Sequence, residues 1–268
     1  MSHFLQTMAV SSAERAAAAV RPTSAELDKP VVPLVLGSFD VIAEIKDRSP
    51  AEGDLAAEDS NRTEQAQRYI DGGAAAISVL TEPSKFSGSL THLEEVVAVA
   101  PNTPVMRKDF LVDPVQILEA RVSGASGVLL IVAMLSDDKI RAMLDCAAEH
   151  GMFVLLESFD SEDLMRASRL LHSSTDQERA GNGQLLFGVN TRNLRTLHVD
   201  PDRLANLAAA LPAARCVAES GLYDADDAAT VAGLGYRLAL VGTALMRSDD
   251  PASLVRAMRK AGSGRVLA

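Results

Sequence analysis

The 268-residue sequence contains no tryptophan, and all aromatic residues together make up only 4% of it. Hydrophobic residues make up 47% of the chain, enough for a large core. Because aromatic rings are so few, this core must be built mainly from alanine, leucine and valine. No apolar run is long enough to cross a bilayer. The N-terminus also lacks the basic start and long apolar stretch of a signal peptide. The sequence therefore predicts a cytoplasmic protein that does not contact a membrane.

Cysteine, clustered histidine and positive charge are also scarce. The two cysteines, Cys146 and Cys216, fall in different predicted elements and are expected to be buried free thiols in a reducing compartment. The five histidines show no HxH or HxxxH pairing, so we expect no metal site. A formal net charge of −10 argues against a nucleic-acid partner. An anionic ligand would need local cations and backbone N–H groups.

What the sequence does contain is a regular alternation of short aliphatic runs with segments of helical period. Eight such pairs follow one another, which indicates parallel strands joined by right-handed crossovers. We therefore predict an α/β fold: a single (β/α)8 TIM barrel over residues 41–268, with residues 1–40 as an N-terminal helical extension. The predicted strands are Val41–Lys46, Ala75–Leu80, Val105–Lys108, Gly127–Val132, Phe153–Glu157, Leu185–Asn190, Cys216–Glu219 and Leu238–Val241.

The alternative is a doubly wound open sheet, but DRSPAEG follows the first strand where that fold usually has a glycine-rich fingerprint. In the extension, Ser11 or Ser12 is predicted to cap a helix that ends near Pro22. His172–Gln184 is predicted to be a flexible loop or an insertion on the amino-terminal face. The predicted barrel helices are Arg62–Asp71, Thr91–Ala100, Pro114–Val122, Asp137–His150, Glu162–Leu171, Pro201–Ala210, Ala225–Gly233 and Ala252–Ala261.

Polar residues gather at the carboxyl ends of the predicted strands, where barrels place their active sites. Glu44 and Lys46 share one face of the first strand, which is costly unless the charges are paired, solvated or functional. Charged or amide groups recur at this position in five strands, although the strand interiors are almost purely aliphatic, and this favours a functional set. Its members are Glu44, Lys46, Lys108, Glu157, Asn190 and Glu219, with Arg107 and Asp109 beside Lys108.

This set permits acid–base chemistry on a small anionic metabolite. The lysines supply positive charge or a general acid, and the glutamates grouped around them offer an acid or a base. Glycine after the last two strands, at Gly221 and Gly242, lets backbone N–H groups approach an anion. The loops after strands 7 and 8 are the usual phosphate site of a barrel. No histidine falls at a strand end, which argues against Ser-His-Asp hydrolysis.

The motifs VIAEIKDRSP, MRKDF, LLES, FGVNTRNL and VAESG, in this order, resemble the indole-3-glycerol phosphate synthase family of tryptophan biosynthesis. The resemblance implies a carboxy-lyase that closes the ring of 1-(2-carboxyphenylamino)-1-deoxyribulose 5-phosphate, releases CO2 and water, and forms indole-3-glycerol phosphate. It implies no cofactor, because the protonated ring intermediate itself accepts the electrons. The partner would be this small phosphorylated, carboxylated metabolite alone, and the chain would be a monomer or weak homodimer.

The resemblance also implies roles for individual residues. Lys108 would protonate the ribulose carbonyl oxygen, while Glu157 and Lys46 would be the acid and base of dehydration, in an order left open. Glu44 and Glu219 would hold the lysines in place. The remaining implied contacts are Asn190 with the sugar hydroxyls, Arg192 with the carboxylate, Phe110 and Leu129 with the aromatic ring, Ser220 with the substrate, and Ser49, Gly221, Gly242 and Thr243 with the phosphate.

One loop departs from the family pattern. The family usually has a sequence close to KKASPSKG after the first strand, whereas this chain has KDRSPAEG, with Ala51 and Glu52 at a serine and a lysine position. Less positive charge beside an anionic substrate would weaken its binding. Two alternatives are a sugar-phosphate isomerase of the tryptophan or histidine pathway and a non-catalytic barrel scaffold. The isomerase is disfavoured because the first strand ends in Glu and Lys. The scaffold is disfavoured because the lysine and glutamate set is intact.

Overall fold

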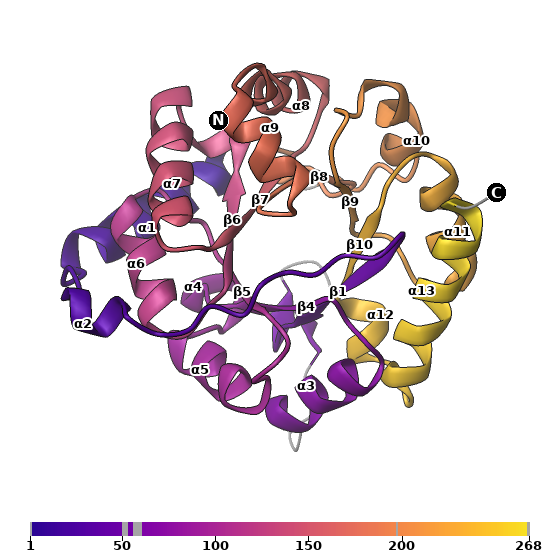
Figure 1. Cartoon of the computed structure of the whole chain (residues 1–268), viewed down its shortest axis with the longest axis horizontal. Helices are drawn as coiled ribbons and strands as arrows, with labels where there is room; N and C mark the ends of the chain where they lie inside the picture. Colours follow the sequence, from indigo (N-terminus) through magenta and orange to yellow (C-terminus); the bar gives the residue numbers. More distant parts are fainter. Residues whose placement is uncertain (1, 50–52, 56–60, 197, 267–268) are drawn as a thin grey trace.

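A closed barrel of parallel strands forms the centre of the chain (Figure 1). The computed structural model describes residues 2–49, 53–55, 61–196 and 198–266. Within these residues the barrel strands run in the order β1-β10-β9-β8-β7-β6-β5-β4, so the last strand closes on the first. This confirms the predicted (β/α)8 fold and excludes the open sheet. The barrel strands are β1 (Asp40–Ile45), β4 (Ala76–Leu80), β5 (Val105–Lys108), β6 (Gly127–Ile131), β7 (Phe153–Ser158), β8 (Leu185–Asn190), β9 (Cys216–Glu219) and β10 (Leu238–Val241).

The first strand is shifted by one residue from its predicted bounds. It begins at Asp40, whose N–H donates to Arg237 O at 3.1 Å, and Lys46 follows the strand. Asp40 is buried, and Arg259 Nη2 in the last helix donates to its carboxylate at 2.9 Å. This partner is 219 residues away, so no local pattern indicates that a carboxylate can lie inside a buried strand.

Helices surround the barrel as the alternation predicts (Figure 1). Side-chain caps fix where several begin: Ser136 accepts from Lys139 N, and Asp113 accepts from Val115 N. The helices are α3 (Arg62–Asp71), α5 (Leu90–Val99), α6 (Pro114–Val122), α7 (Asp137–Glu149), α8 (Ser161–Ser168), α10 (Arg203–Leu207), α11 (Ala225–Gly233) and α13 (Pro251–Val266). Shorter additions are α4 (Pro83–Phe86), α12 (Thr243–Met246), the 3-10 turns η1 (Val132–Met134), η2 (Arg169–His172) and η3 (Ala208–Ala210), and a hairpin of β2 (Arg48–Ser49) and β3 (Gly53–Asp54).

The strands are buried on both faces, as their aliphatic sequences indicate. Every residue of β1, β6 and β7 is buried, including the charged residues Glu44 and Glu157 near the carboxyl ends. The barrel therefore carries its polar side chains at one end of an otherwise aliphatic interior. Among the described helices, none combines the length and apolar composition that a membrane span needs.

The segment His172–Gln184 forms a helix, so of its two predicted forms the flexible loop was wrong. It contains the helix α9 (Ser174–Gly181), anchored by Asp176, whose side chain is fully buried. Arg141 Nη1 lies 2.6 Å and Arg179 Nη1 3.1 Å from the Asp176 carboxylate. The helix is held by ion pairs rather than by an apolar stripe, so hydrophobic periodicity did not reveal it.

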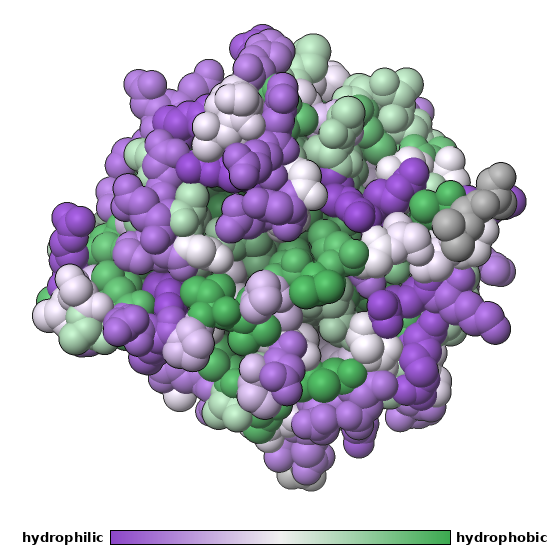
Figure 2. Space-filling view, viewed as in Figure 1, coloured by the Kyte–Doolittle hydropathy of each residue, from purple (hydrophilic) through white to green (hydrophobic). Residues whose placement is uncertain are grey.

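The N-terminal segment passes from one end of the barrel to the other. It forms α1 (His3–Ala18), the short α2 (Ser24–Leu27) and an apolar linker into β1. In Figure 1 the linker crosses in front of the barrel, whereas α1 lies behind α6 and α7. Figure 2, from the same side, shows green apolar surface along the course of the linker, surrounded by polar surface. The linker therefore covers the amino-terminal end of the barrel, where Val32 N donates to Ser126 Oγ at 3.1 Å.

The predicted cap of the N-terminal helix was also wrong. The helix begins more than two turns before the expected cap at Ser11 or Ser12, with Ser2 as N-cap accepting from Leu5 N. Ser12 lies inside the helix with no exposed surface, and its Oγ accepts from Gln116 Nε2 at 2.9 Å. A serine that looks like a cap in the sequence therefore makes a buried tertiary contact.

Candidate active site

A cavity of about 290 Å³ opens at the carboxyl ends of the barrel strands. It collects side chains that are far apart in the sequence, because parallel strands all end at the same edge. The predicted residues that line it are Glu44, Lys46, Lys108, Phe110, Leu129, Glu157, Asn190, Arg192, Ser220, Gly221, Gly242 and Thr243. Of the other two predicted residues, one is absent from this lining and one cannot be assigned to it. Glu219 lies beneath the surface with no exposed area, and the side chain of Ser49 lies outside the described part of the structure.

Glu44 bridges the two lysines. Its Oε1 lies 2.9 Å from Lys46 Nζ and its Oε2 lies 2.8 Å from Lys108 Nζ. Burial alone would raise the pKa of Glu44, but the neighbouring Lys108 and Lys46 lower that pKa to about 2. Glu44 is therefore ionised throughout the physiological range and fixes the spacing of the two ammonium groups.

Gly242 makes room for this bridge. A Cβ atom at position 242 would lie 2.4 Å from Glu44 Oε1 and 3.0 Å from Lys46 Nζ. The end of β10 therefore approaches the charged pair more closely than any residue with a side chain allows. The glycine that the sequence suggested for an anion site also shapes the lysine and glutamate cluster.

Lys108 is held as an ammonium ion. Burial lowers the pKa of its amine, but Glu44, followed by Glu219 and Glu157, raises that pKa above the ordinary lysine value. Lys108 therefore carries a proton at neutral pH at the floor of the cavity.

Glu219 is the opposite case, a carboxyl group whose ionised form is disfavoured. Burial, and then the neighbouring Glu157, raise its pKa well above the ordinary value. Neither oxygen has a hydrogen-bond partner among the described residues, and the contact with Lys108 Nζ, at 3.9 Å, is longer than a hydrogen bond. Burial and Glu157 therefore disfavour the ionised form of Glu219, which lies next to the Lys108 ammonium. A Cβ at Gly188 would lie 2.0 Å from Glu219 Oε1, so glycine in β8 is what accommodates this carboxyl.

Glu157 faces the lysines from β7 and is oriented by Asn190. The Asn190 Nδ2 atom donates to Glu157 Oε2 at 3.1 Å, and Asn190 Oδ1 accepts from Arg192 N at 2.9 Å. Glu157 Oε1 has no hydrogen-bond partner among the described residues. One carboxylate oxygen is thus fixed by protein, while the other is buried at the cavity without a protein donor.

An aromatic wall stands at one side of the cavity. The Phe110 ring lies 5.9 Å from the Phe4 ring in an edge arrangement and 6.1 Å from the Phe86 ring. Sequence analysis identified Phe110 but missed Phe4 and Phe86. Phe86 belongs to α4, whose start is fixed by Glu82 accepting from three backbone N–H groups. A TEPSKF motif after a strand was a usable signal for Phe86, whereas nothing local marks Phe4.

The opposite side of the cavity carries backbone suited to an anion. Ser220 and Gly221 both have left-handed backbone, with φ of 66° and 72°. Gly242 and Thr243 follow β10, and Arg192 follows β8. The loop with Ala51 and Glu52, whose departure from the family pattern was noted above, lies outside the described residues.

Arg107 does not belong to the cavity. Its guanidinium is buried outside the barrel strands, where Nη1 donates to Gln116 O at 2.9 Å and Nε donates to Thr81 Oγ1 at 3.1 Å. Side chains alternate along β5, so Arg107 and Lys108 point in opposite directions. Within the described residues, no group of three or more His, Cys, Asp or Glu side chains is arranged to hold a metal ion.

Fold and site together define a (β/α)8 barrel with a lysine and glutamate cluster at the carboxyl ends of its strands. The family profile described as indole-3-glycerol phosphate synthase matches residues 9–258. The chain belongs to this family.

Individual relatives agree with the family profile. The chain is 45% identical over 244 residues to an indole-3-glycerol phosphate synthase from Nocardioides sp., covering 89% of this chain and 88% of that protein. It is 42% identical to one from Arthrobacter sp., covering 85% and 79%. A solved 3-hexulose-6-phosphate synthase from Salmonella typhimurium superposes with a TM-score of 0.62 at 17% identity, covering 85% of this chain and all of that one. At this identity the last comparison supports the fold alone.

Proposed function

We propose that the chain converts 1-(2-carboxyphenylamino)-1-deoxyribulose 5-phosphate to indole-3-glycerol phosphate, CO2 and water. The observation that carries this proposal is the Glu44 bridge, which holds two ammonium groups at the floor of a cavity that also contains Glu157. Ring closure creates negative charge on the ribulose carbonyl oxygen. An ammonium placed beforehand at that oxygen stabilises the charge and supplies the proton.

Lys108 is our choice for the proton donor in ring closure. The high pKa of its amine keeps it protonated until a strongly basic alkoxide forms next to it. Loss of CO2 then returns an electron pair to the protonated ring, and a proton on the new hydroxyl lets water leave. For this dehydration we propose Glu157 and Lys46 as the acid and base, with either order open.

Substrate contacts follow from the two sides of the cavity. We propose that the aromatic ring lies against Phe110 and Leu129, and that Arg192 with Lys46 binds the carboxylate. Asn190 would orient the sugar hydroxyls, while Glu44 and Glu219 position the lysines. Ser49 and Ser220, with the backbone at Gly221, Gly242 and Thr243, would hold the phosphate end.

The remaining parts of the proposal concern the whole chain. We propose that residues 1–40 act as an extension that covers the barrel, and that residues 41–268 form the catalytic domain. The two cysteines are free thiols, which fits a reducing cytoplasm. Among the described residues, the large apolar side chains that are exposed are few, so we propose a monomer or weak homodimer with no nucleic-acid or membrane partner.

Turnover measured by the growth of indole fluorescence tests the reaction, with EDTA present and no added cofactor. The chain has no tryptophan, so the protein background is low. Lys108→Ala is expected to abolish turnover while substrate affinity changes modestly, because the proton donor is lost and the other contacts remain. A Lys108→Ala enzyme with full rate would refute its role. A wild type that binds substrate without turnover would favour a scaffold or a changed substrate.

A further inference from the structure

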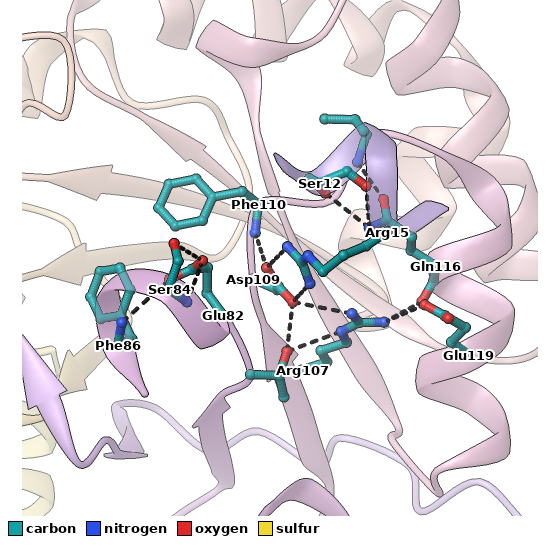
Figure 3. A network of polar contacts seen from close by, with 12 residues as sticks. Ser12, Arg15, Glu82, Ser84, Phe86, Arg107, Asp109, Phe110, Gln116 and Glu119 are labelled. Carbon is teal, nitrogen blue, oxygen red and sulfur yellow. Dashed lines mark hydrogen bonds and ion pairs between the residues drawn. The ribbon is translucent and has the colours of Figure 1, made fainter. Parts of the chain in front are cut away.

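Beside Lys108 lies a carboxylate that the proposed chemistry does not use. Asp109 has no exposed side-chain surface, and Arg15 of α1 reaches it. Arg15 binds it through both terminal nitrogens, at 2.7 Å and 2.8 Å. Figure 3 shows this network, in which Asp109 also accepts from Thr81 Oγ1 at 2.8 Å, Arg107 Nη2 at 3.1 Å and Phe110 N at 2.8 Å.

The network begins where the barrel ladder stops. The register of β5 with β6 ends at Arg107, and its register with β4 ends at Lys108. Beyond Lys108 the backbone is held by the side chain of Asp109, which accepts the next N–H group at Phe110. The direction of the Lys108 side chain and of the Phe110 ring therefore depends on how firmly Asp109 is fixed.

Arg15 is the member of this network that comes from outside the barrel. Burial would raise the pKa of Asp109, but hydrogen bonds from Arg15 and the charges of Arg107 and Arg15 lower that pKa to about 2. The helix that carries Arg15 is docked at two further points, since Ser2 Oγ donates to Leu194 O at 3.1 Å and Gln116 Nε2 donates to Ser12 Oγ at 2.9 Å. Arg15 is thus presented to Asp109 on a helix held along its length.

We infer that Arg15 is a positioning residue for the reaction: its two bonds to Asp109 fix the strand end that carries Lys108 and Phe110. This inference rests on the proposed function. The helix α1 then contributes to rate as well as to covering the cavity. A second ion pair provides a matched comparison, because Arg141 Nη1 lies 2.6 Å from the equally buried carboxylate of Asp176 and neither residue lines the cavity.

The experiment compares Arg15→Gln, Arg15→Lys and Arg141→Gln, each assayed well below its own Tm. Arg15→Gln is expected to lower kcat about tenfold or more, with KM changed by less than about threefold, because small displacements of a catalytic group are costly in rate. Arg15→Lys keeps the charge and one bond, so it is expected to recover part of kcat. Arg141→Gln is expected to lower Tm similarly and leave kcat unchanged.

Several outcomes would overturn the inference. They are a kcat for Arg15→Gln equal to that of Arg141→Gln, no recovery in Arg15→Lys, or a rise in KM alone, which would make α1 only a binding wall.

Hydrogen exchange of the Phe110 amide, measured without substrate, separates this inference from the proposed function. Arg15→Gln is expected to speed that exchange and Arg141→Gln to leave it unchanged. If the wild type shows no turnover, the proposed reaction is refuted. The exchange result then still tests whether Arg15 fixes the strand end that carries Lys108 and Phe110. Normal wild-type turnover with unchanged Phe110 exchange in Arg15→Gln refutes the positioning role alone.

Discussion

At the scale of single residues, burial and then the neighbouring Glu157 raise the pKa of the Glu219 carboxyl well above the ordinary glutamate value. The folded chain keeps the proton that the unfolded chain releases above the ordinary glutamate pKa. Stability is therefore lost as pH rises above that value, at about 1.4 kcal/mol per pH unit, until the raised pKa of the folded state is reached.

Glu219→Gln is expected to remove this pH dependence, since an amide of the same shape needs no proton. The advantage of Glu219→Gln over wild type in free energy of unfolding should grow from pH 5 to pH 8, while turnover falls. Urea unfolding at several pH values measures it. If the two proteins keep a constant difference across this range, Glu219 is not neutral in the folded chain.

Gly188 must be a glycine because the Glu219 carboxyl occupies the space of a side chain at this position. Gly188→Ala puts a Cβ 2.0 Å from Glu219 Oε1, so we expect a loss of about 1–3 kcal/mol and a lower kcat as the carboxyl is displaced. Thermal unfolding and turnover measure both effects. Gly181→Ala is the control, because nothing lies within 4 Å of its added atom. Adding Glu219→Ala should restore the lost stability of Gly188→Ala, and a failure to do so would place the clash elsewhere.

At the scale of elements, α9 shows what a helix without an apolar stripe depends on. Asp176→Ala leaves Arg141 and Arg179 without their shared buried carboxylate. Both guanidinium groups are partly exposed and Arg179 keeps Asp145 at 3.2 Å, so we expect the loss of these charge-assisted bonds to cost about 1.5–3 kcal/mol. We expect that loss in chemical unfolding, with kcat near wild type because Asp176 does not line the cavity. A large fall in kcat with the fold intact would connect α9 to the site.

The elements that sequence reasoning found are those with repeated apolar patterns. Strands such as Leu185–Asn190 and helices such as Pro114–Val122 have their predicted bounds. They bury apolar faces that the pattern shows directly. The start of α1 and the existence of α9 were missed, because their stabilising partners lie elsewhere in the chain. Ser12 bonds to Gln116 and Asp176 to Arg141, and no local rule connects such pairs.

At the scale of the whole molecule, two deeply buried carboxylates make the fold sensitive to acid. Glu44 and Asp109 each have a pKa lowered to about 2 by their cationic neighbours, against burial. The unfolded chain takes up protons first, so stability is complete above the ordinary carboxylate pKa and falls as pH drops towards 2.

We expect the free energy of unfolding to fall by several kcal/mol (on the order of 1.4 kcal/mol per group and pH unit) across this window. Circular dichroism during urea unfolding at stepped pH measures it. In Arg15→Gln the Asp109 share of the fall should shrink, because its pKa returns towards the ordinary value. Equal slopes for the two proteins would mean that Arg15 does not set the ionisation of Asp109.

The sequence by itself determined the barrel, its eight repeating units and the set of strand-end residues that meet at the cavity. It did so because alternation and strand polarity are local patterns that parallel strands with right-handed crossovers satisfy, although the open sheet was excluded only by the closed strand order. Only the tertiary structure decided which charges pair. It put Glu44 between two lysines, left Glu219 without a hydrogen-bond donor among the described residues, and turned Arg107 away from Lys108. The distances between side chains across the barrel determine their pKa values and their ion-pair partners. These distances are established only when the strands close into the barrel.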